Sequence, residues 1–243
     1  MKFLKPIHLI LQRAPFLGSL ALAPLAWLKK LGFTGSRKYW ETRYAAGGTS
    51  GLGSYGEVSE FKAKFLNDFV KKHAIETVIE FGCGDGNQLS LAGYPSYIGL
   101  DVSKSAIRLC IARFKQDATK SFFLYDPDLF HDSHRRFSAE LVISLDVIYH
   151  LVEDEIFYTY MRHLFSASHK FVIIFSSDTN ANAMHLAPHV RNRGFSEWIM
   201  KNITGWRLIE KIPNIFADKN DLYADAAADF FIYEKTNHPE PPG

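Results

Sequence analysis

Several acidic residues in this sequence stand at the end of a short apolar run, where a side chain can do chemistry. They are Glu80, Asp101, Asp126 and Asp146. Glu80 precedes three glycines at alternate positions, which leave the backbone open to a ligand because glycine carries no side chain. Their spacing, G-x-G-x-G, departs from the dinucleotide fingerprint G-x-G-x-x-G. A carboxylate at this loop repels a pyrophosphate and attracts a cation, so a cationic ligand is predicted here.

The second acidic residue, Asp101, is placed to bind sugar hydroxyl groups. It lies 21 residues beyond Glu80, at the end of the apolar run 96–101. An acidic residue about 20 residues after such a loop, at the tip of the neighbouring strand, accepts both hydroxyls of a ribose. The alternative is an aspartate that only caps or turns the chain into the helix beginning at Ser103. The context of strand, turn and helix favours the ribose.

An alternating series of strands and helices must position these residues. Apolar runs predict strands at 77–81, 96–101, 121–126, 141–151 with its exit loop, 170–175, 206–212 and 230–235. Helices are predicted at 58–73, 103–115, 153–168 and 195–201, and in the first of them Lys62 and Lys64 are predicted to face away from the core. Parallel strands bring their carboxyl ends to one edge of a sheet, where ligands bind. The four acidic residues are therefore predicted to converge.

The stretch from Glu80 to Gly86, in this context, resembles the first motif of the class I S-adenosylmethionine-dependent methyltransferases. The resemblance implies S-adenosyl-L-methionine as the cofactor, with the loop along its methionine portion and Glu80 holding its amino end. It also implies that Asp126 meets the adenine amino group, whereas a turn opener before Pro127 is the alternative. The cofactor-binding residues so predicted are Glu80, Gly82, Cys83, Gly84, Gly86, Asp101, Val102, Asp126 and Asp146.

The segment before the first core helix is predicted to cover the site. Residues 39–44, Tyr-Trp-Glu-Thr-Arg-Tyr, resemble the helix that closes over the cofactor in many methyltransferases. The glycine- and serine-rich run 47–56 follows, and such a run is predicted to lack packed regular structure and to act as a lid. A plain linker is the alternative.

The acceptor side is predicted around Asp146 and His150. Small-molecule O-methyltransferases commonly carry an acidic residue at this strand end and a histidine four residues later, and this chain resembles them. His150 is the candidate general base, with Asp146 orienting it or contacting substrate; a core or capping histidine is the alternative. The predicted substrate-binding residues are Tyr149, His189, Arg191 and Arg193, because an arginine fork can bind phosphate or carboxylate.

Composition argues against several other classes. A formal net charge of +2 gives no strong case for a nucleic-acid partner, and the Asp/Asn-Pro-Pro-aromatic motif of nitrogen methylation is absent from the sequence. The pairs His131 with His134 and His185 with His189 have helical spacing, but no carboxylate or cysteine partner is evident, so solvated histidines and no metal are predicted. Two cysteines fit a reducing cytoplasm.

The first 40 residues contain seven Lys or Arg and no acidic residue. Residues 14–28 are uncharged over 15 positions, which is short of the ~20 that a membrane span needs. Residues 1–38 are accordingly predicted either to contact an anionic membrane surface or to dock on the protein, with a secretory signal as a third alternative. The predicted location is the cytoplasm, with the inner face of the membrane as the finer alternative.

Together these patterns predict an α/β protein with a Rossmann-like seven-stranded methyltransferase sheet, helices on both faces and an antiparallel last strand. Residues 1–55 form an extension with the lid, 56–236 the methyltransferase domain and 237–243 a disordered tail. The predicted function is methyl transfer to an oxygen of a small-molecule, glycan or lipid-linked acceptor, because the run 146–155 resembles bacterial methyltransferases associated with cell-surface glycan genes. A nicotinamide oxidoreductase and a non-catalytic cofactor-binding protein are the alternatives, and no feature indicates an oligomeric state.

Overall fold

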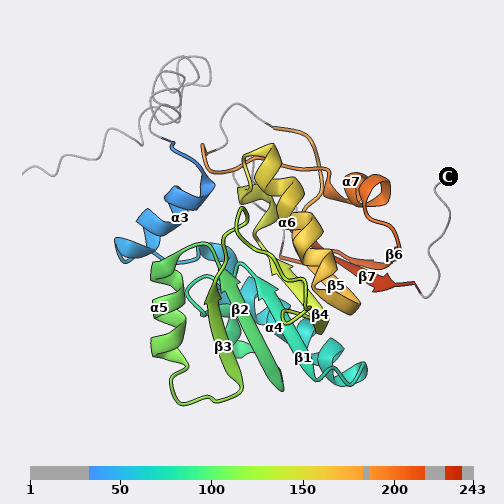
Figure 1. Cartoon of the computed structure of the whole chain (residues 1–243), viewed down its shortest axis with the longest axis horizontal. Helices are drawn as coiled ribbons and strands as arrows, with labels where there is room; N and C mark the ends of the chain where they lie inside the picture. The colour runs from blue at the N-terminus through green and yellow to red at the C-terminus, as the bar shows by residue number, and fades with distance from the viewer. Residues whose placement is uncertain (1–32, 183–186, 217–227, 237–243) are drawn as a thin grey trace, which may run out of the picture.

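One mixed sheet forms the centre of the protein. The computed structural model describes residues 33–182, 187–216 and 228–236, and within them seven strands lie in the order β3-β2-β1-β4-β5-β7-β6 (Figure 1). Strands β1 to β5 run parallel, whereas β7 is antiparallel to both β5 and β6, which confirms the predicted fold. The strands are β1 (Thr77–Phe81), β2 (Ser96–Asp101), β3 (Lys120–Leu124), β4 (Ala139–Leu145), β5 (Ser168–Ser177), β6 (Trp206–Ile212) and β7 (Ala228–Lys235).

Helices cover both faces of the sheet, and α4, α5, α6 and α7 each bury an apolar stripe. The described helices are α3 (Ser36–Ala45), α4 (Gly56–Lys72), α5 (Lys104–Arg113), α6 (Asp154–Ser166) and α7 (Phe195–Asn202). Leu66 of α4 and Cys110 of α5 share one core cluster with β5 residues such as Phe175. Leu164 of α6 and Ile199 of α7 belong to the opposite cluster. The two clusters form the two layers of core on either side of the sheet.

The site is positioned by the point where the strand order reverses. Strand β1 pairs with β2 on one side and with β4 on the other, so the loops after β1 and β4 diverge over the carboxyl edge of the sheet. The two loops pack tightly, because a Cβ atom on Gly82 would clash with Cγ2 of Val147. Gly82 also has φ +86°, a left-handed conformation that favours glycine.

Two expectations about α4 and its approach are wrong. Lys62, predicted to face away from the core, is fully buried, because its ammonium group pairs with Asp146 across the carboxyl edge of the sheet. The run 47–56 is not wholly irregular: Leu52–Ser54 forms a 3₁₀ turn and Gly56 begins α4. Hydrogen bonds from Ser50 and Tyr55 to Asp85 hold this run against the glycine loop, and the composition of the run does not predict them.

The leader segment 1–32, His185 and the tail 237–243 lie outside the described residues. The predictions about membrane contact, docking and the tail therefore stay predictions. Among the residues that the structure describes, no helix is long and apolar enough to cross a membrane.

Replacing Gly82 by Ala tests the close packing of the two loops. We expect Gly82→Ala to lower the free energy of unfolding by about 1–2 kcal/mol for the left-handed backbone and by about 1–3 kcal/mol more for overpacking against Val147. Gly205→Ala is the matched control, since Gly205 has φ +76° with no atom within 4 Å of an added Cβ. Urea unfolding without ligand measures both, and equal losses would contradict the steric part.

Candidate active site

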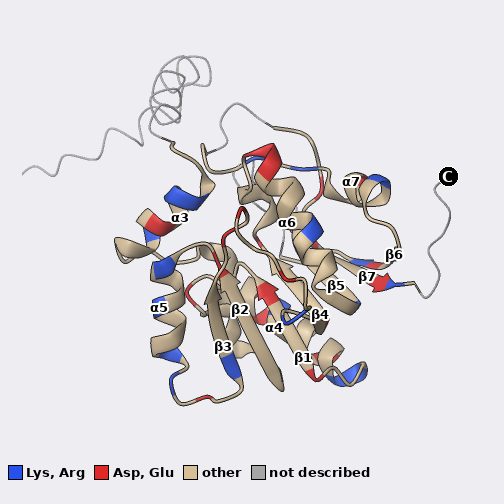
Figure 2. Ribbon diagram, in the orientation of Figure 1, with Lys and Arg blue, Asp and Glu red and all other residues tan. Residues whose placement is uncertain are grey.

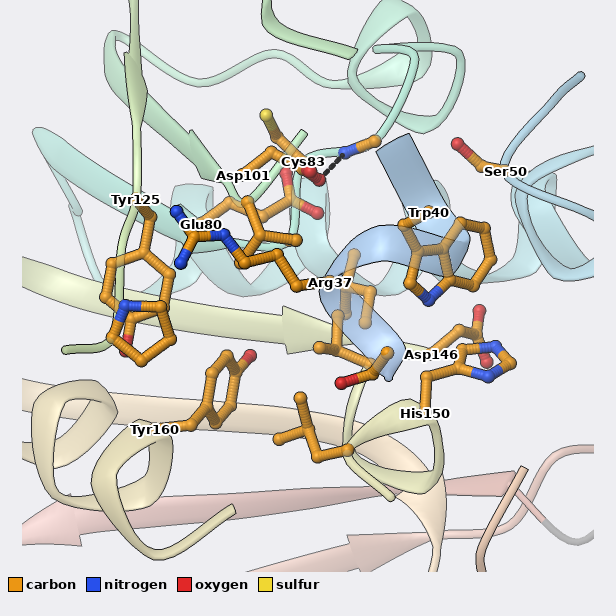
Figure 3. Close-up of a pocket in the computed structure, with 18 of the residues that line it drawn as sticks. Arg37, Trp40, Ser50, Glu80, Cys83, Asp101, Tyr125, Asp146, His150 and Tyr160 are labelled. Atoms are coloured by element: carbon orange, nitrogen blue, oxygen red, sulfur yellow. Dashed lines mark hydrogen bonds between the residues drawn. The ribbon is translucent and has the colours of Figure 1, made fainter. Parts of the chain in front are cut away.

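A pocket lies over the carboxyl ends of the central strands (Figure 3). The space between its walls amounts to about 990 Å³, including the part open to solvent. Three of the four predicted carboxylates line it, namely Glu80, Asp101 and Asp146. Among the other predicted residues, Gly82, Cys83, Gly84, Val102 and His150 also line the pocket. The structure therefore brings most of the predicted site together.

The glycine loop wraps around the carboxylate of Asp101. Gly84 has φ +56°, and its amide N donates to Oδ2 of Asp101 at 2.9 Å. The amide N of Ser103 donates to Oδ1 at 2.8 Å. Burial raises the pKa of Asp101 to about 6, although these two hydrogen bonds lower it. The carboxylate is thus fixed by backbone on both oxygens, and its remaining lone pairs suit the two hydroxyls of a ribose.

Glu80 is buried deeper in the same pocket. The hydroxyl of Tyr97 donates to Oε2 of Glu80 at 2.6 Å. Burial raises the pKa of Glu80 to about 7, even though the hydrogen bond from Tyr97 lowers it. A buried carboxyl group of this kind gains most from a ligand that brings a positive charge and hydrogen-bond donors.

Gln88 is a site residue that the sequence analysis missed. Its Nε2 donates to the carbonyl oxygen of Ser59 at 3.0 Å, whereas its Oε1 is buried without a hydrogen-bond partner. The residue lines the pocket with only 8% of its surface exposed. A buried acceptor without a partner costs free energy, so a ligand that donates a hydrogen bond to Oε1 would bind favourably here. An ammonium group has three donors, and the amino end of S-adenosylmethionine fits Glu80 and Gln88 on these grounds.

The predicted adenine side is arranged differently from the expectation for Asp126. Tyr125, Pro127 and Asp128 line the pocket, but the carboxylate of Asp126 accepts two hydrogen bonds from Arg37 of α3, at 3.1 and 2.5 Å. Gly86 also stands behind the lining, where an added Cβ would meet Phe114 at 2.8 Å. In this arrangement Asp126 holds the covering helix, and its contact with adenine stays a prediction.

Helix α3 contributes Arg37, Trp40 and Tyr44 to the lining of the pocket, and Figure 3 shows the first two. Its first residue, Ser36, donates from N and Oγ to Glu153 at 2.9 and 2.6 Å. Its Glu41 accepts from both Ser103 and Ser105 at the start of α5. The helix is therefore tied by carboxylate contacts to three separate parts of the sheet edge.

The glycine-rich run is tied to the cofactor loop through Asp85. Oδ2 of Asp85 accepts from the amide N of Ser50 and from the hydroxyl of Tyr55, both at 2.9 Å. The hydroxyl of Ser50 in turn accepts from the amide N of Asp85 at 3.0 Å. Ser50 and Ser54 line the pocket, so this run forms part of its wall.

His150 is half-buried at the end of the pocket nearest Trp40 (Figure 3). Its Nδ1 donates to the carbonyl oxygen of His189 at 3.0 Å, which leaves the lone pair on Nε2. The ring of Trp40 packs edge-on against the His150 ring at 4.8 Å. Burial lowers the pKa of His150 to about 4, so its imidazole is neutral near pH 7 and can accept a proton.

Asp146 is held by groups other than His150. Its Oδ2 pairs with Nζ of Lys62 at 2.5 Å, and its Oδ1 accepts from the hydroxyl of Tyr149 at 3.1 Å. The group that orients His150 in this structure is the His189 carbonyl. Asp146 therefore does not orient His150 in this structure, and the alternative, contact of Asp146 with substrate, stays a prediction.

The predicted acceptor-binding arginines form a structural cluster instead. The guanidinium of Arg193 is buried, donates to the carbonyl oxygens of Leu151 and Val152, and pairs with Asp154. Arg191 pairs with Asp154 at 3.0 Å and donates to the Val152 carbonyl. Neither arginine lines the pocket, and the contacts named above fix the segment after β4; their contact with substrate stays a prediction.

His189 is likewise not the solvated residue that was predicted. Its ring stacks on Tyr39 of α3 with centroids 4.0 Å apart, and the Tyr39 hydroxyl lies 3.2 Å from its Nε2. Burial lowers the pKa of His189 to about 4. His189 therefore connects α3 to His150, which the spacing with His185 did not indicate. In the part of the chain that the structure describes, no group of three His, Cys, Asp or Glu residues is arranged to hold a metal ion.

The sheet order and this pocket define the fold of the S-adenosylmethionine-dependent methyltransferases, and comparison with known proteins confirms the predicted resemblance at this level. The N-methyltransferase NodS from Bradyrhizobium japonicum WM9, in complex with S-adenosyl-L-homocysteine, matches with a TM-score of 0.62 and 14% identity over 84% of this chain and 100% of that chain. The methyltransferase domain of bacterial CtHen1 matches with a TM-score of 0.55 and 20% identity, over 73% of this chain and 98% of that chain. No family model matches the sequence.

One curated relative shows similarity in sequence. It is a small RNA 2′-O-methyltransferase from Arabidopsis thaliana, 28% identical over 109 residues. The match spans 40% of this chain but only 12% of the relative. This similarity and the structural matches bear on the fold, and the acceptor has to be argued from this protein's own site.

Replacing Gln88 tests whether the pocket binds an ammonium group. We expect Gln88→Met to weaken the binding of S-adenosylhomocysteine by about 5- to 100-fold. A hydrogen bond to a charged group contributes about 1.5–3 kcal/mol. The loss is somewhat smaller here because methionine also removes the unpaired oxygen from the unbound protein. The affinity for 5′-methylthioadenosine, which lacks the amino-acid portion, is expected to stay unchanged. Calorimetry on both ligands measures the difference, with Gln116→Met, outside the pocket lining, as control. Equal losses for the two ligands would contradict the assignment.

Proposed function

We propose that the protein transfers a methyl group from S-adenosylmethionine to an oxygen atom of its acceptor. The observation that supports this proposal is that one pocket holds groups suited to both ends of the cofactor. Asp101, held by backbone amides, suits a ribose, and Glu80 with the unpaired Gln88 oxygen suits an ammonium group. When bound, S-adenosylmethionine supplies an activated methyl group together with its own leaving group. The chain's own residues must then align the acceptor and exclude water.

His150 is the residue best placed to act on the acceptor. Its Nδ1 proton is committed to the His189 carbonyl, so Nε2 can take the proton from a hydroxyl group. Trp40 packs against the imidazole and α3 covers the pocket, which limits the access of water. An oxygen acceptor agrees with this arrangement because a hydroxyl group must lose its proton when it is methylated, and a neutral base can take that proton.

The test of the activity begins with binding. S-adenosylhomocysteine and NAD are compared by calorimetry, and tight binding of the first with weak binding of the second supports the proposal over a nicotinamide oxidoreductase. Incubation with methyl-labelled cofactor and fractionated glycans, lipids and metabolites then identifies a methylated product. Binding without any labelled product, with every fraction tested, would favour a non-catalytic cofactor-binding protein.

For the acceptor, we favour a glycan or a lipid-linked molecule in the cytoplasm, at the inner face of the membrane. The support is the sequence resemblance to glycan-associated methyltransferases and the basic, apolar composition of residues 1–38. An RNA 2′-hydroxyl is the second candidate, favoured by the 28% identity with the small RNA 2′-O-methyltransferase. RNA oligonucleotides therefore belong in the same labelling experiment, and a labelled 2′-O-methyl product would replace the glycan.

The leader makes the membrane proposal testable. We expect the full chain to co-sediment with anionic vesicles at low salt, because each Lys or Arg near the surface contributes about 1 kcal/mol. Added salt should weaken this binding by screening the charges. Removal of residues 1–32, which leaves α3 in place, should abolish sedimentation and keep the affinity for S-adenosylhomocysteine. A full chain that stays in the supernatant would favour a docked leader and a soluble acceptor.

His150→Gln tests the base. With labelled acceptor formation as the readout and cofactor saturating, we expect turnover to fall by about 10²- to 10⁴-fold. Because the pKa of His150 is lowered to about 4, protonation inactivates the parent only as the pH falls towards 4, so its turnover should not drop between pH 8 and 6 on account of this residue.

The control is His169→Gln, which changes an exposed histidine on β5. It should leave turnover unaltered, and both variants should keep the parent's affinity for S-adenosylhomocysteine. If His150→Gln turns over as fast as the parent, His150 is a packing residue and the transfer proceeds by alignment alone.

A further inference from the structure

Lys62 is a fully buried cation that the proposed reaction does not yet use. It belongs to α4, and its side chain has no exposed surface. Its Nζ lies 2.5 Å from Oδ2 of Asp146 and 5.2 Å from the centroid of the Phe175 ring. Burying an ammonium group costs several kcal/mol unless it is paired with good geometry, so a lysine at this place requires the carboxylate that it meets.

The partner of Lys62 is held in an unusual conformation. Asp146 has φ +59°, which costs a residue with a side chain about 1–2 kcal/mol. Its amide N donates to the carbonyl oxygen of Phe175 at 2.9 Å, and its Oδ1 accepts from Tyr149. Above it, a Cβ atom added to Gly53 would come within 2.6 Å of Oδ2. The carboxylate is therefore enclosed by Lys62, Tyr149 and the backbone of the glycine-rich run.

Lys62 also acts on the neighbouring carboxyl group of Glu80. Burial raises the pKa of Glu80, with Asp101 and Asp146 adding to the increase, whereas Tyr97 and Lys62 lower it. The balance is a pKa of about 7. Three carboxyl groups thus share this end of the pocket, and Lys62 supplies a positive charge among them from the helix behind.

The remaining titratable groups around Glu80 are neutral in the relevant pH range. Tyr97 of β2 donates to it, and Tyr94 and Tyr160 interact with it from the loop before β2 and from α6. Burial raises the pKa of all three phenols well above their usual range. The hydrogen bond with Cys110 and burial raise the pKa of the Cys83 thiol in the same way. The charges that decide the state of Glu80 are therefore those of Lys62, Asp101 and Asp146.

We propose that Lys62 is a positioning residue for cofactor binding: its buried ammonium group fixes the Asp146 carboxylate against Tyr149 and offsets the negative charge at the end of the pocket that receives an ammonium ligand. This inference rests on the proposed binding of S-adenosylmethionine. Lys62 does not line the pocket, so it acts through Asp146 and Glu80 and not by touching the ligand.

The inference has a consequence for the pH dependence of binding. Glu80 attracts an ammonium group only when ionised, so the affinity rises as the pH increases through the pKa of Glu80. Without Lys62, Glu80 stays protonated to a higher pH, and the midpoint of the rise in affinity moves to higher pH. Without the negative charge of Asp146, the midpoint moves down. The two substitutions are thus expected to act in opposite directions.

The experiment is calorimetric titration of the full chain with S-adenosylhomocysteine from pH 5.5 to 8.5. We expect Lys62→Met to move the midpoint of the binding curve to higher pH, since the substitution removes the positive charge that lowers the pKa of Glu80. Asp146→Asn should move it down, and the double variant should return close to the parent. The control is Lys64→Met on the same helix, where the lysine is 79% exposed and pairs with Asp68, and it should change nothing.

5′-Methylthioadenosine separates this effect from a general loss of structure. It shares the ribose that Asp101 binds but has no ammonium group, so its pH profile should be the same in parent, Lys62→Met and Asp146→Asn. A midpoint that is unmoved in folded Lys62→Met overturns the inference, as does equal weakening of both ligands at every pH. If Lys62→Met does not fold, the inference is tested with Asp146→Asn alone. It is overturned if the midpoint of the pH dependence of binding does not fall in that variant. A parent that binds neither ligand would instead refute the proposed function.

Discussion

The structure depends on keeping several carboxyl groups buried close together at one edge of a sheet. Each of them needs its own donors, because desolvation and mutual repulsion oppose the charged forms. Asp101 obtains two backbone amides, which requires the left-handed conformation of Gly84. Asp146 obtains Lys62 and the hydroxyl of Tyr149. The negative charge of Glu80 is the least compensated of the three, because its carboxylate has a single hydrogen bond, from Tyr97. The local backbone of the loops after β1, β2 and β4 follows from these requirements.

The same kind of contact holds the cover of the pocket. Helix α3 and the glycine-rich run are attached through Glu41, Asp85, Asp126 and Glu153, each of which accepts hydrogen bonds across the sheet edge. Most of these contacts are partly buried, and each contributes about 0.5–1.5 kcal/mol of net free energy. The body of the protein is held differently, by two apolar layers on the faces of the sheet. Figure 2 shows the acidic and basic residues of α3 and of the sheet edge beneath it.

The fold and the cofactor end could be predicted from the sequence because their signals are local. Strand periodicity, the alternate glycines and the 21-residue spacing from Glu80 to Asp101 all lie within short stretches. Lys62 was misplaced because helical periodicity puts it on the polar side of α4, and only the distant Asp146 makes its burial favourable. The role of Gln88 depends on an oxygen left without a partner, which no pattern of residue types records. Arg193 was read as a ligand for substrate because the sequence does not show that the carbonyls of Leu151 and Val152 would take up its donors.

The acceptor is harder to predict than the cofactor for a physical reason. The groups proposed for the cofactor come mainly from residues 80–101, whose strands and loops are fixed by neighbouring hydrogen bonds. The groups around His150 come from three segments far apart in the chain: Trp40 on α3, His150 after β4, and His189 before α7. Their arrangement is set by contacts between segments. Proteins that share this fold can accordingly act on different acceptors, as an N-methyltransferase and a small RNA 2′-O-methyltransferase among the similar proteins do. If His150 acts on the acceptor as proposed, we expect acceptor specificity to depend on α3 and the segment around His189, the parts that pack on His150.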